Sequence, residues 1–284
     1  MTEDIRKPVV ASVFYPEDKL NLKRMIKTFL SNVPSDITEF LIKSNIDNIF
    51  GLIVPHAGYV YSGQVASFGY SLINEKSFDT VVLIGPSHRT YFEGFSLCRF
   101  KAYGTPFGEI PIDTKFSEAL IKNGGGIFDY LDSAHTFEHS IEVQLPFLYS
   151  TLINNFEIVP IVMGEQSYEN AVAGASVIAE TLKETDKSAL FIISTDLSHY
   201  HSDEMARELD DRFMKILSSM NAKKLIETVN QGDVEACGAG PVAVFIEIAK
   251  KMGKNNIKNL VYKNSGETSG DYSRVVGYLS SVIW

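Results

Sequence analysis

The sequence contains little that would tie the protein to an oxidising compartment or to a membrane. Two cysteines in 284 residues are too few for a disulfide framework, so Cys98 and Cys237 are expected to be free thiols. No apolar run approaches the roughly 20 residues that a membrane-spanning helix needs. The first residues, from Met1 to Asp4, lack the basic region and apolar core of a signal peptide. These absences predict a cytoplasmic protein with no membrane partner.

Positive charge is also scarce. Lysine and arginine number 26 against 35 aspartates and glutamates, which gives a formal net charge of -9, and the basic residues are scattered. A nucleic-acid surface needs clustered lysines and arginines to neutralise phosphates, so no nucleic-acid partner is expected.

What the sequence has instead is a repeated pattern of apolar runs that end in histidine. Near-continuous apolar runs are typical of strands covered on both faces, and in open α/β sheets ligands bind outside the carboxyl ends of such strands. All six histidines lie in these stretches or in one loop between them. The pattern therefore predicts the edge of an active site. The three runs, with their polar ends, cover 51–58, 81–88 and 191–201.

Hydrophobic periodicity and turn residues predict alternating helices and strands. Ser62 and Ser202 are expected to cap helices. Glycines and prolines between Phe95 and Pro111 predict short, antiparallel strands. The other expected helices lie at 17–32, 114–123, 141–152, 168–184, 221–230 and 239–251, and the expected strands at 9–16, 51–54, 80–84, 157–162, 189–194, 257–263 and 274–283.

The order of these elements predicts the fold class. Strand, helix and strand in succession form the βαβ unit of a parallel sheet, and the short strands over 95–111 would make that sheet mixed. No linker, repeat or low-complexity tract divides the chain. We therefore predict one α/β domain over residues 1–284, a three-layer α/β/α sandwich with a central mixed sheet.

His56 and His88 follow two of the strand ends, each within two residues of a proline. Proline ends sheet pairing and stiffens the loop, which suits a ligand that must be positioned before a metal arrives. Either histidine alone could simply cap a helix or lie in a loop. The repeated pattern favours one shared site.

Cys237 lies among small residues at an expected helix start, where the helix dipole and free N–H groups stabilise a thiolate. The alternative is a small buried hydrophobic residue, which is common for cysteine. Cys98, inside a strand-like stretch, fits that alternative better.

Asp196 and His199 follow the third strand end and are three residues apart. The carboxylate could orient the imidazole, or both groups could face a substrate. A capping aspartate with a hydrogen-bonded loop histidine would give the same pattern, and His201 could equally face solvent.

One motif predicts a different chemistry. Residues His135 to His139 read H-x-x-E-H, the inverted zinc-protease signature, which requires one helix to place both histidines on one face. The convincing helix begins only around Ser140, and three glycines at 124–126 lie upstream. We therefore expect His135 in a polar loop outside the site, and we keep His139 and Glu142 near it.

Five stretches together resemble the Memo family, within a similarity that runs from about Arg6 to the C-terminus. They are 55–63, 84–88, 138–147, 194–200 and 237–238. The fold of that family is similar to that of the class III extradiol ring-cleaving dioxygenases, with a mixed sheet between helices. The resemblance implies the same architecture here.

The resemblance also implies a metal site of His56, His88 and Cys237, with Asp196 and His199 beside it. His199 would match the acid/base histidine of the dioxygenases. A cysteine stands where those enzymes complete a 2-His-1-carboxylate site. Eukaryotic relatives are linked to receptor signalling, cell motility and iron or copper chemistry. Many prokaryotic ones are encoded beside a radical-SAM protein and a small partner domain, which makes these two candidate partners.

Three functions are open. The first is a cytoplasmic metal-dependent redox enzyme or dioxygenase-like protein that uses Fe(II) or Cu, with Zn as a further candidate, on a small or peptide-like substrate. Two imidazoles and a thiolate leave coordination positions open, His199 would move a proton, and Asp196 would orient His199. Tyr59, His139 and Glu142 are expected to contact the substrate. The second function is a non-catalytic module that binds a peptide or protein in the same cleft, and the third is metal-dependent hydrolysis.

Overall fold

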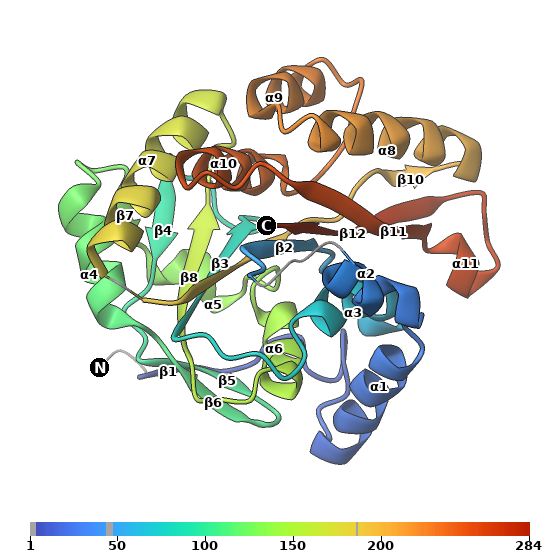
Figure 1. The fold of residues 1–284 in the computed structure, drawn as a ribbon, viewed down its shortest axis with the longest axis horizontal. Coiled ribbons are helices and arrows are strands. Elements are labelled where there is room, and N and C mark those ends of the chain that lie inside the picture. The colour runs from blue at the N-terminus through green and yellow to red at the C-terminus, as the bar shows by residue number, and fades with distance from the viewer. Residues whose placement is uncertain (1–3, 44–47, 186) are drawn as a thin grey trace.

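A nine-stranded mixed sheet forms the centre of the computed structural model, which describes residues 4–43, 48–185 and 187–284 (Figure 1). The strand order is β10-β12-β2-β9-β3-β8-β4-β7, and β11 pairs with β12. The strands are β2 (Gly51–Val54), β3 (Thr80–Pro86), β4 (Phe95–Leu97), β7 (Phe128–Tyr130), β8 (Glu157–Met163), β9 (Ala189–Ser194), β10 (His199–His201), β11 (Ile257–Asn264) and β12 (Val275–Ile283).

The four central strands, β2, β9, β3 and β8, are parallel, whereas β12 runs antiparallel to β2 and β4 runs antiparallel to β8. The predicted mixed sheet is thus confirmed. A separate three-stranded sheet consists of β1 (Ile5–Arg6), β5 (Ala102–Thr105) and β6 (Gly108–Pro111). The antiparallel pair β5 and β6 supplies the short strands expected in this region.

The central strands are buried on both faces because their side chains alternate between two hydrophobic clusters. In β3, Val82 and Ile84 belong to one cluster, while Val81 and Leu83 belong to the other. A strand directs successive side chains to opposite faces, so a continuous apolar run requires a covering layer on each side.

Two groups of helices provide these layers (Figure 1). This confirms the three-layer α/β/α arrangement and fits the fold of the class III extradiol dioxygenases. One face is covered by α4 (Thr114–Asn123), α7 (Tyr168–Thr185), α8 (Asp203–Ser218), α9 (Ala222–Asn230) and α10 (Ala239–Lys251), and the other by α1 (Lys19–Ser31), α2 (Ser35–Lys43), α3 (Tyr59–Leu72) and α6 (Leu145–Thr151). The short helices are α5 (Asp132–Thr136), α11 (Gly266–Ser269) and the 3-10 turn η1 (Glu142–Gln144).

The strand predicted over 9–16 is wrong. This segment forms turns, with an isolated bridge between Ala11 and Tyr15 and a left-handed φ of 68° at Ser12. Its apolar residues suggested a strand, but the N–H groups of Val9 and Val10 donate to the buried carboxylate of Glu142 and not to a neighbouring strand. A side chain thus takes over the hydrogen bonds that a sheet would have made.

The start of α3 also differs from the prediction. The helix begins at Tyr59 after Gly58, and the hydroxyl of Ser62 donates to the carbonyl of Ala57 at 2.8 Å, so it does not cap the helix. By contrast, Ser202 caps α8 as expected. The sequence reasoning also missed α2 and the three-residue strands β7 and β10. No helix in the described ranges is both long and apolar enough to cross a membrane.

Candidate metal site

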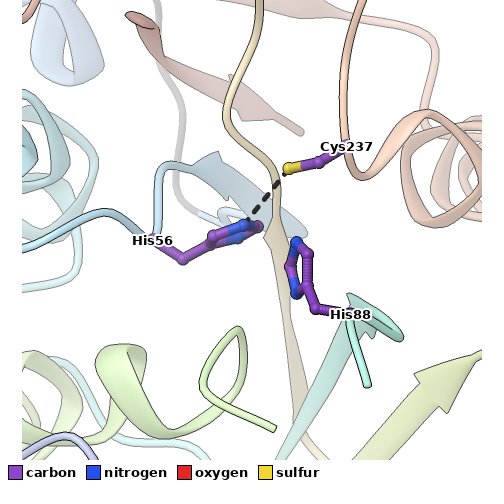
Figure 2. Close-up of side chains that lie close together, drawn as sticks. All are labelled: His56, His88 and Cys237. Carbon is purple, nitrogen blue, oxygen red and sulfur yellow. Dashed lines mark hydrogen bonds between the residues drawn. The ribbon is translucent and has the colours of Figure 1, made fainter. Parts of the chain in front are cut away.

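The three predicted ligands lie together at the carboxyl end of the central strands (Figure 2). His56 follows β2, His88 follows β3, and Cys237 precedes α10. Because β9 lies between β2 and β3 and runs parallel to both, Asp196 and His199, which follow β9, are brought to the same edge. The sheet order therefore gathers residues that are far apart in the sequence.

The spacing of the three side chains fits a shared ion. Nε2 of His56 is 3.2 Å from Sγ of Cys237, and the three ligand atoms all lie within 4.8 Å of one another. Ligands on one tetrahedral ion, with bonds of about 2.0–2.3 Å, are separated by roughly 3.5 Å. The three candidate ligand atoms are therefore close enough to hold one ion.

The second ring nitrogen of each histidine is already occupied. Nδ1 of His56 lies 2.7 Å from Oγ of Ser194, whose own proton goes to the carbonyl of Ser140 at 2.6 Å. The Ser194 oxygen is therefore an acceptor, so His56 carries its proton on Nδ1 and leaves the lone pair of Nε2 free. His88 directs Nδ1 to Oε1 of Glu138 at 2.9 Å. Such partners fix the tautomer and orientation of metal-binding histidines.

Electrostatics favour the neutral imidazole of His56 and the ionised carboxylate of Glu138. Burial, followed by the nearby His88, holds the pKa of His56 well below its usual value. Burial alone would raise the pKa of Glu138, but the hydrogen bond from His88 outweighs it, and the pKa falls to about 2. A neutral imidazole and an ionised carboxylate behind the second imidazole are the forms that metal binding requires.

The sequence suggested that the helix start would stabilise Cys237 as a thiolate, but the structure favours the protonated thiol. Burial, together with the charge of Asp196, raises the pKa of the Cys237 thiol well above its usual value. Its sulfur accepts the N–H of Asp196 at 3.1 Å. The thiol must therefore release its proton to solvent when a metal binds, because a metal-bound cysteine is a thiolate.

The loop before α10 packs closely against β9. A Cβ atom on Gly238 would lie 2.4 Å from the carbonyl oxygen of Ser194, and the Gly238 N–H donates to Oγ1 of Thr195 at 2.9 Å. Only glycine allows this approach, which sets the neighbouring sulfur against the histidines.

His139 lies beside the three candidate ligands. Its ring stacks on that of His88 at 4.6 Å and meets the edge of Phe14 at 5.0 Å. Burial lowers the pKa of His139 to about 4. His88, Glu138 and His139 form a second group whose ligand atoms are close enough to hold an ion. The arrangement places His139 where the sequence reasoning expected it, near the site.

Asp196 and His199 make different contacts. Oδ1 of Asp196 accepts the backbone N–H of His56 at 2.8 Å, and burial raises the pKa of Asp196 to about 6. Nδ1 of His199 points at the carbonyl of Leu197 at 2.7 Å. That carbonyl orients the ring and places its proton on Nδ1, which leaves Nε2 as a proton acceptor. A cavity of about 260 Å³ is lined by His199 and by the rings of His56, His88 and His139.

Glu142 is fully buried and faces the N-terminal segment. Its carboxylate accepts from the guanidinium of Arg6, from the N–H groups of Val9 and Val10, and from the hydroxyl of Tyr15 at 2.7 Å. Direct contact of Glu142 with a substrate stays a prediction. In the structure, Glu142 holds residues 6–15 in place through these contacts, and Phe14 of this segment lines the cavity.

Tyr59 is buried as well, with its hydroxyl donating to the carbonyl of Val143 at 2.7 Å, and its contact with a substrate likewise stays a prediction. His201 lies 2.9 Å from Glu235, outside the group of candidate ligands. Cys98 is buried, as expected.

The prediction of a polar loop for His135 is wrong. The residue lies in α5 and is fully buried, with Nδ1 2.8 Å from the hydroxyl of Tyr103 and Nε2 3.1 Å from the carbonyl of Ser96. It belongs to neither candidate metal group among the described residues. The short helix ends at Thr136, before Glu138 and His139, so the H-x-x-E-H motif does not form the single helical face that the protease site needs.

Fold and site together define an α/β protein with a histidine and cysteine cluster at the carboxyl edge of a mixed sheet. The chain belongs to the Memo family, because the family described as Memo-like protein matches residues 6–282. A MEMO1 family protein of Methanosarcina acetivorans is 36% identical over 280 residues, which cover 99% of each chain. MEMO1 family proteins of Methanobrevibacter smithii and Methanocaldococcus jannaschii are each 38% identical over 98% of this chain and 99% of theirs. The predicted family is confirmed.

Proposed function

We propose that the protein is a metal-dependent redox enzyme, dioxygenase-like in its chemistry, that binds its metal through His56, His88 and Cys237. The observation that carries this proposal is the convergence of three ligand atoms whose supporting groups are already in place. Two loop histidines with no common role would not both direct a free Nε2 toward one sulfur.

The donor set fits several ions. A soft thiolate favours Cu(I) and also binds Fe(II) and Zn(II), while imidazole suits all three. Three protein ligands leave at least one coordination position for a substrate, as catalytic sites do. A bound Fe or Cu ion would supply the one-electron and oxygen chemistry that side chains lack.

The residues of the chain bind and orient the substrate and move its proton. His199 offers a free Nε2 toward the cavity and takes a proton from the substrate, because its Nδ1 is held by a carbonyl. Asp196 fixes the backbone of His56 and so positions a ligand. Phe14 and Tyr200 line the same cavity and limit the entry of water.

A non-catalytic role in the same cleft is the second candidate. It is favoured by exposed aromatic rings near the strand ends, with Tyr61 45% and Tyr200 64% exposed. A peptide-like ligand, or the proposed radical-SAM protein and small partner domain, would use such rings. Metal-dependent hydrolysis, the third candidate function, needs the same three ligands. The cytoplasmic location stays a prediction.

Metal titration tests the proposal. Protein prepared anaerobically should take up one Cu(I), Fe(II) or Zn(II) per chain. Glu138→Gln, which removes the hydrogen-bond partner of a ligand, should lower the metal affinity roughly 10–100-fold. His56→Ala and Cys237→Ala, which remove a ligand itself, should lower it further. Cys237→Asp should lose most Cu(I) affinity and keep some Fe(II) binding.

The matched control is Glu157→Gln, which removes a carboxylate partner of Lys187 at the first residue of β8, the opposite end of the strands from the candidate ligands. It should leave the metal affinity unchanged. Equal affinity in the wild type and in Cys237→Ala would contradict the ligand assignment. Stoichiometric metal without oxygen consumption on any candidate catechol or peptide would favour the binding module.

A further inference from the structure

The cavity at the candidate metal site borders a second cavity. The first has a volume of about 260 Å³ and the second about 300 Å³, and both are lined by Tyr200, Val276 and Tyr278. Ligand pockets in proteins usually measure roughly 300–1,000 Å³. The first cavity alone is small for a substrate, whereas the two together fall within this range.

Arg274 lies in the second cavity and is the only cation among the described residues that line it. Its guanidinium lies 5.4 Å from the centre of the Tyr200 ring. The pairing of β10 with β12 sets this neighbourhood, because His201 lies opposite Val275. No ion pair or hydrogen bond of the Arg274 side chain is found within the described ranges. The charge is therefore free to bind an anion.

Asp271, the one acid among the described residues that line the second cavity, is already engaged. Asp271 accepts from the N–H of Ser273 at 2.9 Å and from its hydroxyl at 2.6 Å. One guanidinium beside one carboxylate, in a chain of net charge -9, matches a singly charged anion better than a phosphate dianion. Carboxylate is the common singly charged group that binds arginine through two parallel hydrogen bonds.

Tyr278 marks the junction of the two cavities. It is 2% exposed, yet its hydroxyl has no hydrogen-bond partner among the residues that the structure describes. The buried hydroxyls without a partner among the described residues are those of Ser198 and Ser280, so the Tyr278 hydroxyl is accessible from the cavities and can donate to a ligand there. Tyr200, with a left-handed φ of 63°, stands at the same junction. Strained residues that border a cavity are typical of ligand sites.

We infer that the substrate is an elongated organic carboxylate whose charged end binds Arg274. Its uncharged body lies along Tyr200 and hydrogen-bonds the hydroxyl of Tyr278, and its reactive end reaches the rings of His56 and His199. This inference rests on the proposed function, because the metal cluster defines the reactive end. It narrows the substrate class from any small or peptide-like molecule to a singly charged acid.

Direct binding tests the inference. The probes are phenylacetate, phenylpropionate and phenylbutyrate, each compared with its uncharged primary amide by calorimetry on metal-free and metal-loaded protein. At least one carboxylate should bind about tenfold more tightly than its amide, the difference expected for a charge-assisted hydrogen bond. Arg274→Gln should abolish this preference, and Tyr278→Phe should weaken the acid and the amide alike.

The matched control is Arg24→Gln, which removes one exposed positive charge on α1 that lines neither cavity. It should keep the preference. Equal affinity for acid and amide, a preference that survives Arg274→Gln, or no saturable binding of any carboxylate would overturn the inference. A preference that depends on Arg274 in protein that takes up no metal would support this inference while refuting the proposed function.

Discussion

Replacing Glu142 by glutamine should destabilise the protein severely, although it changes few atoms. The carboxylate is fully buried and accepts from Arg6, Val9, Val10 and Tyr15. Glutamine keeps one acceptor oxygen and turns two N–H donors toward groups that are themselves donors. It also leaves the guanidinium of Arg6, 1% exposed, without its charge partner.

Breaking a buried ion pair on one side typically costs about 3–5 kcal/mol, a large part of the roughly 5–15 kcal/mol by which a domain is stable. Urea unfolding followed by circular dichroism measures this cost, and hydrogen exchange should show faster exchange at the amides of Val9 and Val10. The matched control is Asp211→Asn, which breaks an exposed ion pair with Lys215. The Asp211 side chain is 53% exposed and that of Lys215 is 74% exposed. An exposed pair of this kind contributes only about 0.3–0.5 kcal/mol. Equal losses in the two variants would refute the reasoning.

Two further predictions concern the histidines. His199→Ala should keep the metal stoichiometry and lose substrate-dependent oxygen consumption, because His199 acts on the substrate; loss of the metal would make it a ligand instead. The pKa of His135 is lowered to about 4 by burial, so between about pH 6.5 and pH 4 the unfolded chain binds a proton that the folded chain refuses. The free energy of unfolding should therefore fall by about 2 kcal/mol between pH 7 and pH 5 from this group. His135→Gln should be less stable at pH 7 but show a shallower pH dependence, and parallel curves for the two proteins would contradict the assignment.

The sequence predicted the sheet and its functional edge because both depend on local patterns. Continuous apolar runs mark strands covered on two faces, and the residues that follow them collect at one edge whatever the order of the strands. The positions of His56, His88 and His199 therefore followed from where each run stops. Cys237 has no such run before it, and only the family resemblance added it to the ligand set.

The errors arise where a distant partner decides the local structure. The segment over 9–16 has the composition of a strand, but Glu142, more than a hundred residues away in sequence, takes its hydrogen bonds. His135 was expected in a polar loop, yet it lies in the interior, where Tyr103 and Ser96 form hydrogen bonds with its ring. None of these three partners can be identified from periodicity. Glu138, which orients His88, belonged both to the misleading protease motif and to the stretch 138–147 of the family resemblance, but neither gave it this role.

The order of strands has a consequence for how the protein is made. β2 and β3 leave the ribosome early, but in the finished sheet they are separated by β9, which is synthesised about a hundred residues after β3. A nascent chain that paired β2 directly with β3 would have to open again to admit β9. Contacts of such long sequence separation form slowly. The candidate ligands His56 and Cys237 are 181 residues apart and come together at the finished edge, so bound metal would report that β9 has been inserted between β2 and β3.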